Sequence, residues 1–306
     1  MQIRCECTAA DSTVCSLTDC LQFVLVRDRY LPNAVLRIRT VLPEAMEEPV
    51  RIRLFLDDFA VHDGNVQTWA CERKNGQLQA RIESQSFAAA LMKNQLIPGL
   101  YTQVTLASLL ETYHLPYITC EDVPSINYIV VKDNTAMWDS IVAYNYKLCH
   151  SYPFVRLPNL LCMMPRQDQN EIILPEQAIL SESTGGSTAD MISRVDMADE
   201  IGEYGSFTRS NPEALRRGIT RVRQILLDRQ YLYNPYDALQ FRIDVSNRRM
   251  HSKTVRYAGY CGEDLEDLAS CRFVRGRVSR IVIAGDRSGI TTEDTFCFDP
   301  FCNTAS

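Results

Sequence analysis

The chain has 306 residues, enough for two or three domains, and its 46% apolar and 23% charged residues are ordinary for a folded protein. The formal net charge of -6 argues against a general nucleic-acid binder, which needs surplus Lys and Arg to displace counterions from phosphate. No apolar run approaches the ~20 residues of a membrane helix, so we expect no membrane insertion.

The N-terminal sequence predicts a small barrel or sandwich of short strands. Residues 34–39 and 50–56 alternate apolar side chains with Arg, a period of two that buries one sheet face and leaves the other wet. Asp63-Gly64 predicts a turn between strands at 59–61 and 66–73. Asn75-Gly76 predicts a hairpin turn before a strand at 77–84, because both turn positions need positive φ.

The middle of the chain predicts a connecting unit of strand, helix, strand and strand over residues 123–165. A β-rich run at 126–131 leads to a helix that Asp133, Asn134 or Thr135 would cap, followed by strands at 153–157 and 160–164. Before this unit, residues 86–92 predict a short helix or bend, and residues 105–113 predict a helix.

The C-terminal part mixes strand and helix signals. Residues 166–170 predict a polar linker, 171–175 a strand, and 181–188, with Gly185-Gly186, a flexible or hairpin-tip loop. Asn211-Pro212 is a typical helix start, and the apolar stripe after it predicts a helix over 211–229. Residues 239–245 favour a strand but also fit a helix, Arg275-Gly276 predicts a hairpin, and 299–306 predict a loose end. No short repeat is visible, and two diverged barrels of similar construction fit this layout.

Twelve cysteines raise the questions of disulfides and metal. A disulfide scaffold is normally short and secreted, whereas residues 1–6 lack a signal-peptide core, so we expect cytoplasmic synthesis with reduced, mostly buried thiols. Zinc sites need two ligand pairs at spacings such as C-x₂₋₄-C, so we expect no metal. The pairs that fail are Cys5 with Cys7, Cys15 with Cys20, Cys297 with Cys302, and Cys149 with His150.

No catalytic signature surrounds the other candidate groups, so we expect no catalytic or cofactor-binding residues and no cofactor. The acid pairs are adjacent in sequence, so on a strand their carboxylates point to opposite faces and cannot flank one sugar bond. Both tryptophans are interpreted as core, with exposure at a protein interface as the alternative. The groups considered are His62, His114, His150, His251, Asp57-Asp58, Asp199-Glu200, Trp69, Trp138, and the arginines 216, 217, 221 and 223, which we expect to meet water or an acidic neighbour.

Residues 81–165 resemble the hub proteins of contractile phage tails, the late control protein D group, and their relatives in contractile injection systems. The resemblance lies in the order of segments. It is carried by Ala80-Arg81-Ile82-Glu83-Ser84, Ser86-Phe87-Ala88-Ala89-Ala90-Leu91, Val104-Thr105-Leu106-Ala107-Ser108-Leu109-Leu110, Val130-Val131-Lys132-Asp133-Asn134-Thr135-Ala136-Met137-Trp138-Asp139-Ser140-Ile141, Pro153-Phe154-Val155 and Asn159-Leu160-Leu161. The block from residue 81 to residue 165 covers about a third of the chain.

The resemblance implies an α+β, β-rich fold with two barrels related to the tail tube and no catalysis. Three copies would present six barrels, matching a hexameric tube on one side and a trimeric spike on the other. The expected domains are a first barrel at 1–104, a small α/β connecting lobe at 105–166, a second barrel at 167–290 that includes the helix 211–229, and a tail at 291–306.

The predicted function is therefore that of a structural, non-enzymatic baseplate hub, assembled in the cytoplasm into a virion tail or phage-like particle. Its expected partners are two further copies, the tail-tube protein and the central spike, with no nucleic acid. Two alternatives stay open: an α+β hydrolase with a Cys/His or carboxylate site, and a generic adaptor. A deep pocket with a cysteine next to a histidine would favour the enzyme.

Overall fold

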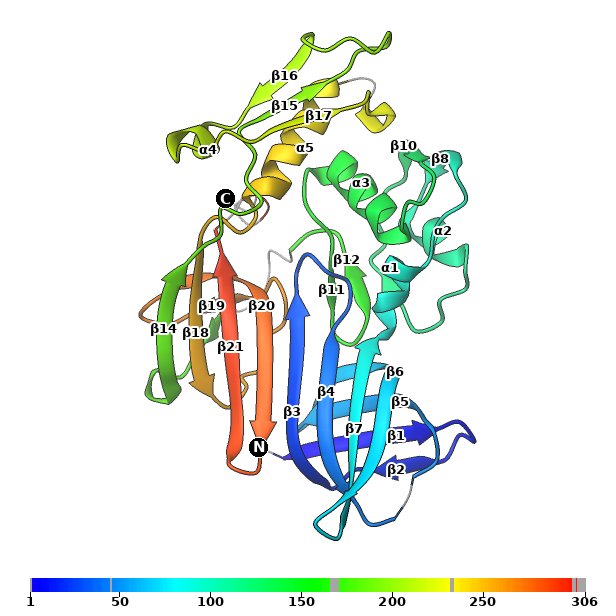
Figure 1. Ribbon diagram of the computed structural model, residues 1–306, viewed down its shortest axis with the longest axis vertical. Helices are drawn as coiled ribbons and strands as arrows, with labels where there is room; N and C mark the ends of the chain where they lie inside the picture. Colours follow the sequence, from blue (N-terminus) through cyan, green and yellow to red (C-terminus); the bar gives the residue numbers. More distant parts are fainter. Residues whose placement is uncertain (1, 45, 166–170, 232–233, 299–300, 302–306) are drawn as a thin grey trace.

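The computed structural model describes residues 2–44, 46–165, 171–231, 234–298 and 301, and it has an α+β, β-rich fold. Its centre is one long antiparallel sheet path in the order β14-β18-β21-β20-β3-β4-β7-β6-β5-β1-β2 (Figure 1). The path joins two halves of the chain through the ladder between β20 and β3. The two end strands of this path are β14 and β2. The predicted β-rich class is confirmed, but the two halves, which were expected to form separate barrels, are joined in one open sheet.

The first half supplies seven strands, β1 to β7. Their bounds are β1 Ile3–Ala9, β2 Val14–Ser16, β3 Asp19–Asp28, β4 Val35–Leu42, β5 Pro49–Leu56, β6 Phe59–Lys74 and β7 Gln77–Ser86. Alternation decides which face is buried: Leu36 and Ile38 of β4 lie in the core, whereas Arg37 and Arg39, which alternate with them, point to the other face. Asn75 and Gly76 form the predicted hairpin turn, with φ of 52° and 78°.

A connecting lobe follows β7. Its elements are the 3-10 turn Phe87–Ala89, α1 Ala90–Lys93, β8 Gly99–Val104, α2 Leu106–Glu111, β9 Thr119–Cys120, β10 Ile126–Val131, α3 Met137–Cys149, β11 Phe154–Arg156 and β12 Leu160–Cys162. The predicted strands and helices are present here, but α3 begins one residue after Ala136, which serves as its N-cap without a side-chain hydrogen bond. Asn134, a predicted cap, instead lies in a turn with φ of 59°.

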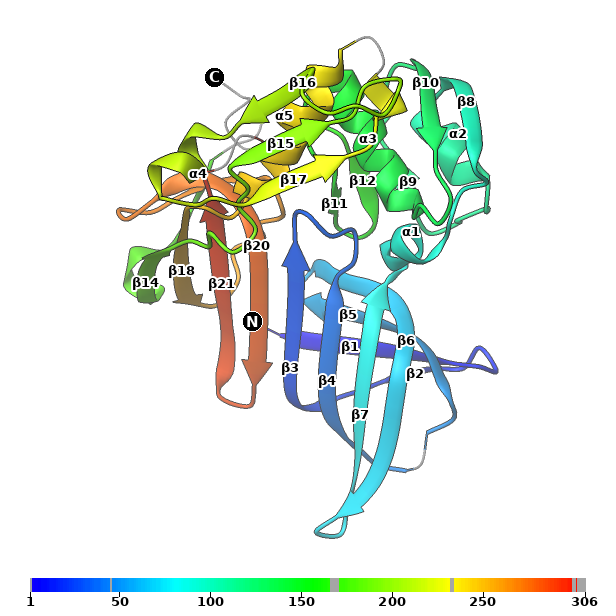
Figure 2. The same cartoon turned by 45° about the horizontal axis from the view of Figure 1, so that its top comes forward.

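The second half repeats the sheet and carries an inserted lobe. Its elements are β13 Ile172–Ile173, the 3-10 turn Glu176–Ala178, β14 Ile179–Gly185, β15 Arg194–Met197, β16 Phe207–Ser210, α4 Pro212–Arg216, β17 Val222–Ile225, the 3-10 turn Arg229–Tyr231, α5 Pro235–Asn247, β18 Ser252–Ala258, β19 Leu268–Ser270, β20 Arg275–Asp286 and β21 Gly289–Cys297. The insertion, residues 186–251, lies with the connecting lobe at one end of the long sheet (Figure 2).

Both halves use the same strand order. In chain order, the main strands of the first half are β3, β4, β6 and β7, and they lie as β3-β4-β7-β6. Those of the second half are β14, β18, β20 and β21, and they lie as β14-β18-β21-β20. In each half the third strand also pairs with an extra strand that precedes it, β5 with β6 and β19 with β20. The molecule is therefore a tandem repeat of one sheet design.

Several turn predictions were wrong because a local signal was overridden by long strands. Asp63-Gly64 lies inside β6, and the turn falls at Asp57-Asp58. Gly64 is required there because a Cβ would lie 2.1 Å from the carbonyl oxygen of Gln85 on β7. Arg275-Gly276 begins β20, whose hairpin turn is at residues 287–288, and Gly185 ends β14 instead of forming a hairpin tip.

The predicted helix over 211–229 was also wrong in extent. It begins at Pro212 as expected but ends at Arg216, because the chain turns at Gly218 with φ of 72° and enters β17, parallel to β15. Residues 239–245 belong to α5, the helical alternative. Residues 291–297, predicted as the start of a tail, belong to β21. The polar linker 166–170 and most of the predicted loose end, 299–300 and 302–306, lie outside the described residues.

Candidate assembly interface

Two strands at the ends of the eight-stranded main sheet expose an open edge. Residues 66–74 of β6 pair with β7 only, since β5 pairs with β6 no further than Asn65. At the other end, β14 pairs with β18 only. Both stretches are mostly exposed, including the large side chains Trp69 (41%) and Leu180 (57%). A free strand edge offers unpaired N–H and C=O groups to another strand, so these two edges are candidate contact surfaces.

One face of this sheet is wet and carries charged side chains together with valines such as Val24, Val26 and Val282. The opposite face packs in the core through residues such as Phe23, Leu25 and Ile283. Among the described residues, the charged side chains of the wet face are Arg37, Arg39, Lys74, Arg81, Arg256 and Arg280, against Asp19, Asp28, Glu72, Glu83, Asp286 and Glu293. Several pair across strands, such as Arg37 with Glu83 at 2.9 Å. The face is balanced in charge, with valines between the charged side chains.

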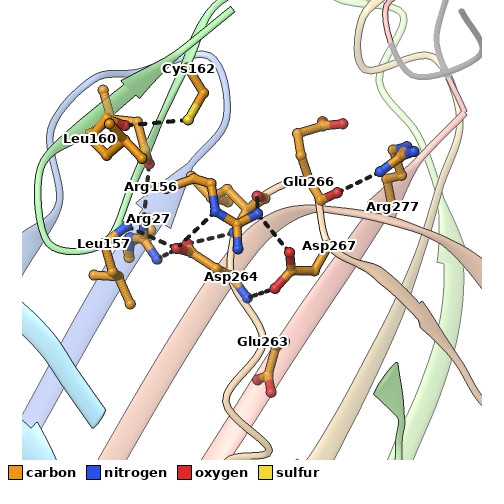
Figure 3. Close-up of polar contacts among 12 residues, drawn as sticks. Arg27, Arg156, Leu157, Leu160, Cys162, Glu263, Asp264, Glu266, Asp267 and Arg277 are labelled. Atoms are coloured by element: carbon orange, nitrogen blue, oxygen red, sulfur yellow. Dashed lines mark hydrogen bonds and ion pairs between the residues drawn. The ribbon is translucent and has the colours of Figure 1, made fainter. Parts of the chain in front are cut away.

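A buried ionic cluster fastens the two halves to the connecting lobe (Figure 3). Arg27 of β3 donates to the carboxylate of Asp264, in the loop before β19, and to the carbonyl oxygen of Val155 on β11 at 3.0 Å. The same carboxylate accepts from the backbone N–H of Leu157 at 2.8 Å. Arg156 donates to Asp267 at 2.6 Å. One carboxylate thus contacts the first half and the connecting lobe.

A second ion pair lies even deeper at the same joint. The Nε of Arg29 and the carboxylate of Glu266 are 2.5 Å apart, and both side chains are fully buried. Burying charges is costly unless each is paired and hydrogen-bonded, and removal of one partner leaves the other stranded. The joint between the halves therefore has one well-defined geometry and holds the eight main strands as one unit.

Near this joint lie two buried carboxyl groups of different character. Glu263 accepts a hydrogen bond from the hydroxyl of Tyr257 at 2.5 Å and one from the N–H of Cys261 at 3.0 Å. Neither oxygen of Asp294 on β21 has a hydrogen-bond partner among the described residues. Burial raises the pKa of Asp294 well above its ordinary value, and the charge of Glu263 raises it further. Burial also raises the pKa of Glu263.

The described cysteines are spread over both halves of the sheet and the connecting lobe. Cys7 lies directly opposite Cys15 on paired strands β1 and β2, a contact that sequence spacing did not reveal. Burial raises the pKa of Cys7 to about 12 and that of Cys20 to about 11, so these thiols stay protonated near neutral pH. Within the described ranges no group of three or more Cys, His, Asp or Glu is arranged to hold a metal. Cys302 lies outside those ranges, and the described cysteines other than Cys297 are free thiols.

The histidines occupy separate structural positions. His62 is buried and its Nε2 lies 2.8 Å from the hydroxyl of Ser84. His114 and His150 have positive φ, 46° and 52°, in a turn and at the end of α3. His251 lies 3.1 Å from a guanidinium nitrogen of Arg217. The structure does not bring these four side chains into one site.

The remaining candidates have structural contacts. Asp57 accepts from the N–H of Gln2 at 2.6 Å, and Asp199 accepts from two N–H groups of its own loop. Trp138 lies in the core as predicted, whereas Trp69 is partly exposed, which corrects its assignment to the core.

The four arginines considered for a helix face serve different purposes. Arg216 and Arg217 pair with Glu213 on α4. Arg221 donates to three backbone carbonyls, those of residues 188, 189 and 191. Because the helix ends at Arg216, these side chains form no continuous basic face, and most of them meet groups of their own chain. No helix in the described part of the chain has the length and apolarity to span a membrane.

The fold is that of phage tail proteins. The 43 kDa tail protein of prophage MuSo2 from Shewanella oneidensis superposes with a TM-score of 0.71 at 11% identity, over 99% of each chain. A tail protein from Neisseria meningitidis MC58 gives 0.71 at 10% identity, over 100% of this chain and 99% of its own.

An Escherichia coli protein, c3393, gives a TM-score of 0.52 at 9% identity, over 93% of this chain and 77% of its own. It is described as a component of the type VI secretion system with structural similarity to the T4 bacteriophage tail proteins gp27 and gp5. No protein-family model and no curated protein sequence matches the chain. The comparison therefore establishes the fold and leaves the function to be argued from the molecule.

Proposed function

We propose that this protein is a structural baseplate hub of a contractile phage tail or phage-like injection particle. Three copies form a ring that joins a hexameric tail tube to a central spike. The fold shared with phage tail proteins supports a structural role. The observation that carries the proposal is the tandem sheet, in which two halves of equal strand order follow one another in one antiparallel path.

The arithmetic of the sheet favours a closed ring of three chains. Each chain presents two equivalent four-stranded units, so three chains present six, the number that a hexameric tube requires. Eight strands per chain is an even number, so the pairing between β6 of one chain and β14 of the next would be antiparallel like every other ladder of the path. The wet, charge-balanced face would then line the bore.

The two lobes stand at one end of the sheet and leave the other end to hairpin turns (Figures 1 and 2). A ring of such chains has two different faces, one for each partner. Each chain would contribute a first barrel-related unit, the connecting lobe and a second barrel-related unit to the ring. The chains would assemble in the cytoplasm and reside in the tail baseplate.

Sedimentation equilibrium of the purified chain tests the proposal. One chain weighs 34.9 kDa, and the expected particle has three times that mass. Electron microscopy of the assembled particle should show threefold density between the tube and the spike. Six copies at that position, or a single copy, would contradict the proposal.

A further inference from the structure

The two halves agree in register as well as in strand order. Between β6 and β7 a bulge at Gln67 separates the pairs Val66–Ser84 and Thr68–Glu83. Between β20 and β21 a bulge at Ser279 separates the pairs Val278–Phe296 and Arg280–Thr295. Both hairpins close on two turn residues, after Lys74 and after Asp286. Aligned on these features, Lys74 corresponds to Asp286 and Thr68 to Arg280.

The other edge agrees in the same way. Between β3 and β4 the register shifts between Cys20 and Gln22, and between β14 and β18 it shifts between Ile179 and Ser181. Gln22 thus corresponds to Ser181. The ladders β4–β7 and β18–β21 then coincide without any further shift, since Val35–Gln85 falls on Ser252–Cys297.

From this correspondence we infer the residue pairing of the contact between neighbouring protomers. Within the chain, β20 pairs with β3 from Arg280–Asp28 to Asp286–Gln22. Transferred to the free edges, the same ladder pairs β6 of one protomer with β14 of the next, and Lys74 lies opposite Ser181. This inference rests on the proposed function, because it takes the occupant of each edge to be a second copy of this chain.

The side chains that this register brings together are complementary. Arg73 lies opposite Glu182 of the next protomer, and both are exposed in the single chain. Directly opposed charges of different sign stabilise a sheet, whereas like charges destabilise it. Trp69 lies opposite Gly186, which has no side chain to obstruct the indole. Cys71 lies opposite Thr184. By the same alignment, these two residues correspond to Ile283 and Leu25, which pair within the chain on its buried, apolar sheet face.

A disulfide tests the register directly. Residues opposed in an antiparallel ladder have Cα atoms ~4.5–5.5 Å apart, within the range of a disulfide. The full-length T184C variant, which retains Cys71, should on mild oxidation give covalent dimers and trimers on a non-reducing gel, and reduction should return them to monomers. The matched control S183C places its thiol on the other sheet face and should give less than a tenth of that yield, as should T184C combined with C71S.

A charge reversal gives a second, independent readout. R73E alone places two carboxylates opposite each other. The protein concentration at which half of the chains are trimeric should therefore rise at least tenfold. R73E combined with E182R restores opposite charges and should recover most of that loss. The register would be overturned if T184C trimers form no disulfide with Cys71, or if R73E assembles as well as the native chain. Either result would leave the hub proposal standing. A chain that stays monomeric in solution and in the particle would overturn both.

Discussion

Arg27 and Asp264 are 237 residues apart in sequence, yet the guanidinium of one donates directly to the carboxylate of the other inside the protein. The side chains are only 5% and 8% exposed. The contact ties β3 of the first half to the loop that precedes β19 of the second half. It lies beside the β20–β3 ladder, so the ion pair and the sheet secure the same joint.

Asp264→Ala should destabilise the chain by about 3–5 kcal/mol, because it leaves Arg27 buried without its charge partner and removes the acceptor for the N–H of Leu157. Urea unfolding measures the change. Glu83→Gln serves as the control, since it breaks the exposed pair with Arg37 and should cost no more than about 1 kcal/mol. Equal losses in the two variants would show that the buried cluster does not secure the joint.

Asp294→Asn should become increasingly stabilising, relative to the native chain, as pH rises. The pKa of Asp294 is raised in the folded state, so the folded chain holds this proton more tightly than the unfolded chain. Its contribution is fully present below the unfolded pKa of about 4 and is lost as pH rises through the folded pKa. The free energies of unfolding of both chains between pH 5 and 9 measure the effect.

Asp286→Asn is the matched control, because Asp286 lies exposed at the end of β20. Hydrogen bonds from Ser288 lower the pKa of Asp286. Its contribution is therefore present above the unfolded pKa and is lost as pH falls, the opposite sign. A difference between the native chain and Asp294→Asn that stays constant with pH would contradict the assignment of a raised pKa to Asp294.

Because of His62, we expect the free energy of unfolding to fall as pH drops below 6.5. Burial lowers the pKa of His62 from 6.5 to about 3, so the ring stays neutral in the folded chain while it binds a proton in the unfolded chain. The stability this provides is present above pH 6.5 and falls as pH drops toward 3, by at most about 1.4 kcal/mol per pH unit. His62→Gln lacks that titration, so its deficit at pH 7.5 should shrink at pH 5. An unchanged deficit would refute a neutral, buried His62.

Gly64→Ala should disrupt the β6–β7 ladder, because the new Cβ would lie 2.1 Å from a backbone oxygen that cannot move aside alone. We expect a cost of about 1–3 kcal/mol or more in thermal or urea unfolding. Gly185→Ala is the matched control on β14, where the nearest atom would be 3.9 Å away, and it should stay within about 0.5 kcal/mol. Similar costs at both glycines would show that close backbone approach is not what requires Gly64.

Local periodicity predicts much of this fold. Alternation of Arg37 and Arg39 with buried neighbours gave β4 and its wet face, and Asn75-Gly76 gave the hairpin between β6 and β7. The signal fails where distant residues decide. Gly64 resembles a turn residue, yet it is needed for close contact with β7.

The candidate interface was largely beyond reach of the sequence. The resemblance of residues 81–165 pointed to the right fold, but the two free edges depend on which strands pair, and β3 meets a strand from the far end of the chain. Trp69 alone carried a signal, as an aromatic that fits either a core or a protein surface. The proposed pairing of Arg73 with Glu182 can be found only when the two halves are aligned by the registers of their strands.

The matching bulges show that the two halves share one backbone design. Phe23 and Leu25 of β3 fall on Glu182 and Thr184 of β14, so equivalent positions carry different side chains while the pairing of the strands is the same. The loop of residues 29–34 in the first half has its counterpart in the whole stretch 186–251 of the second half, and the strands on either side keep the same register. The shared design therefore depends on how the strands pair, and it tolerates different side chains at equivalent positions.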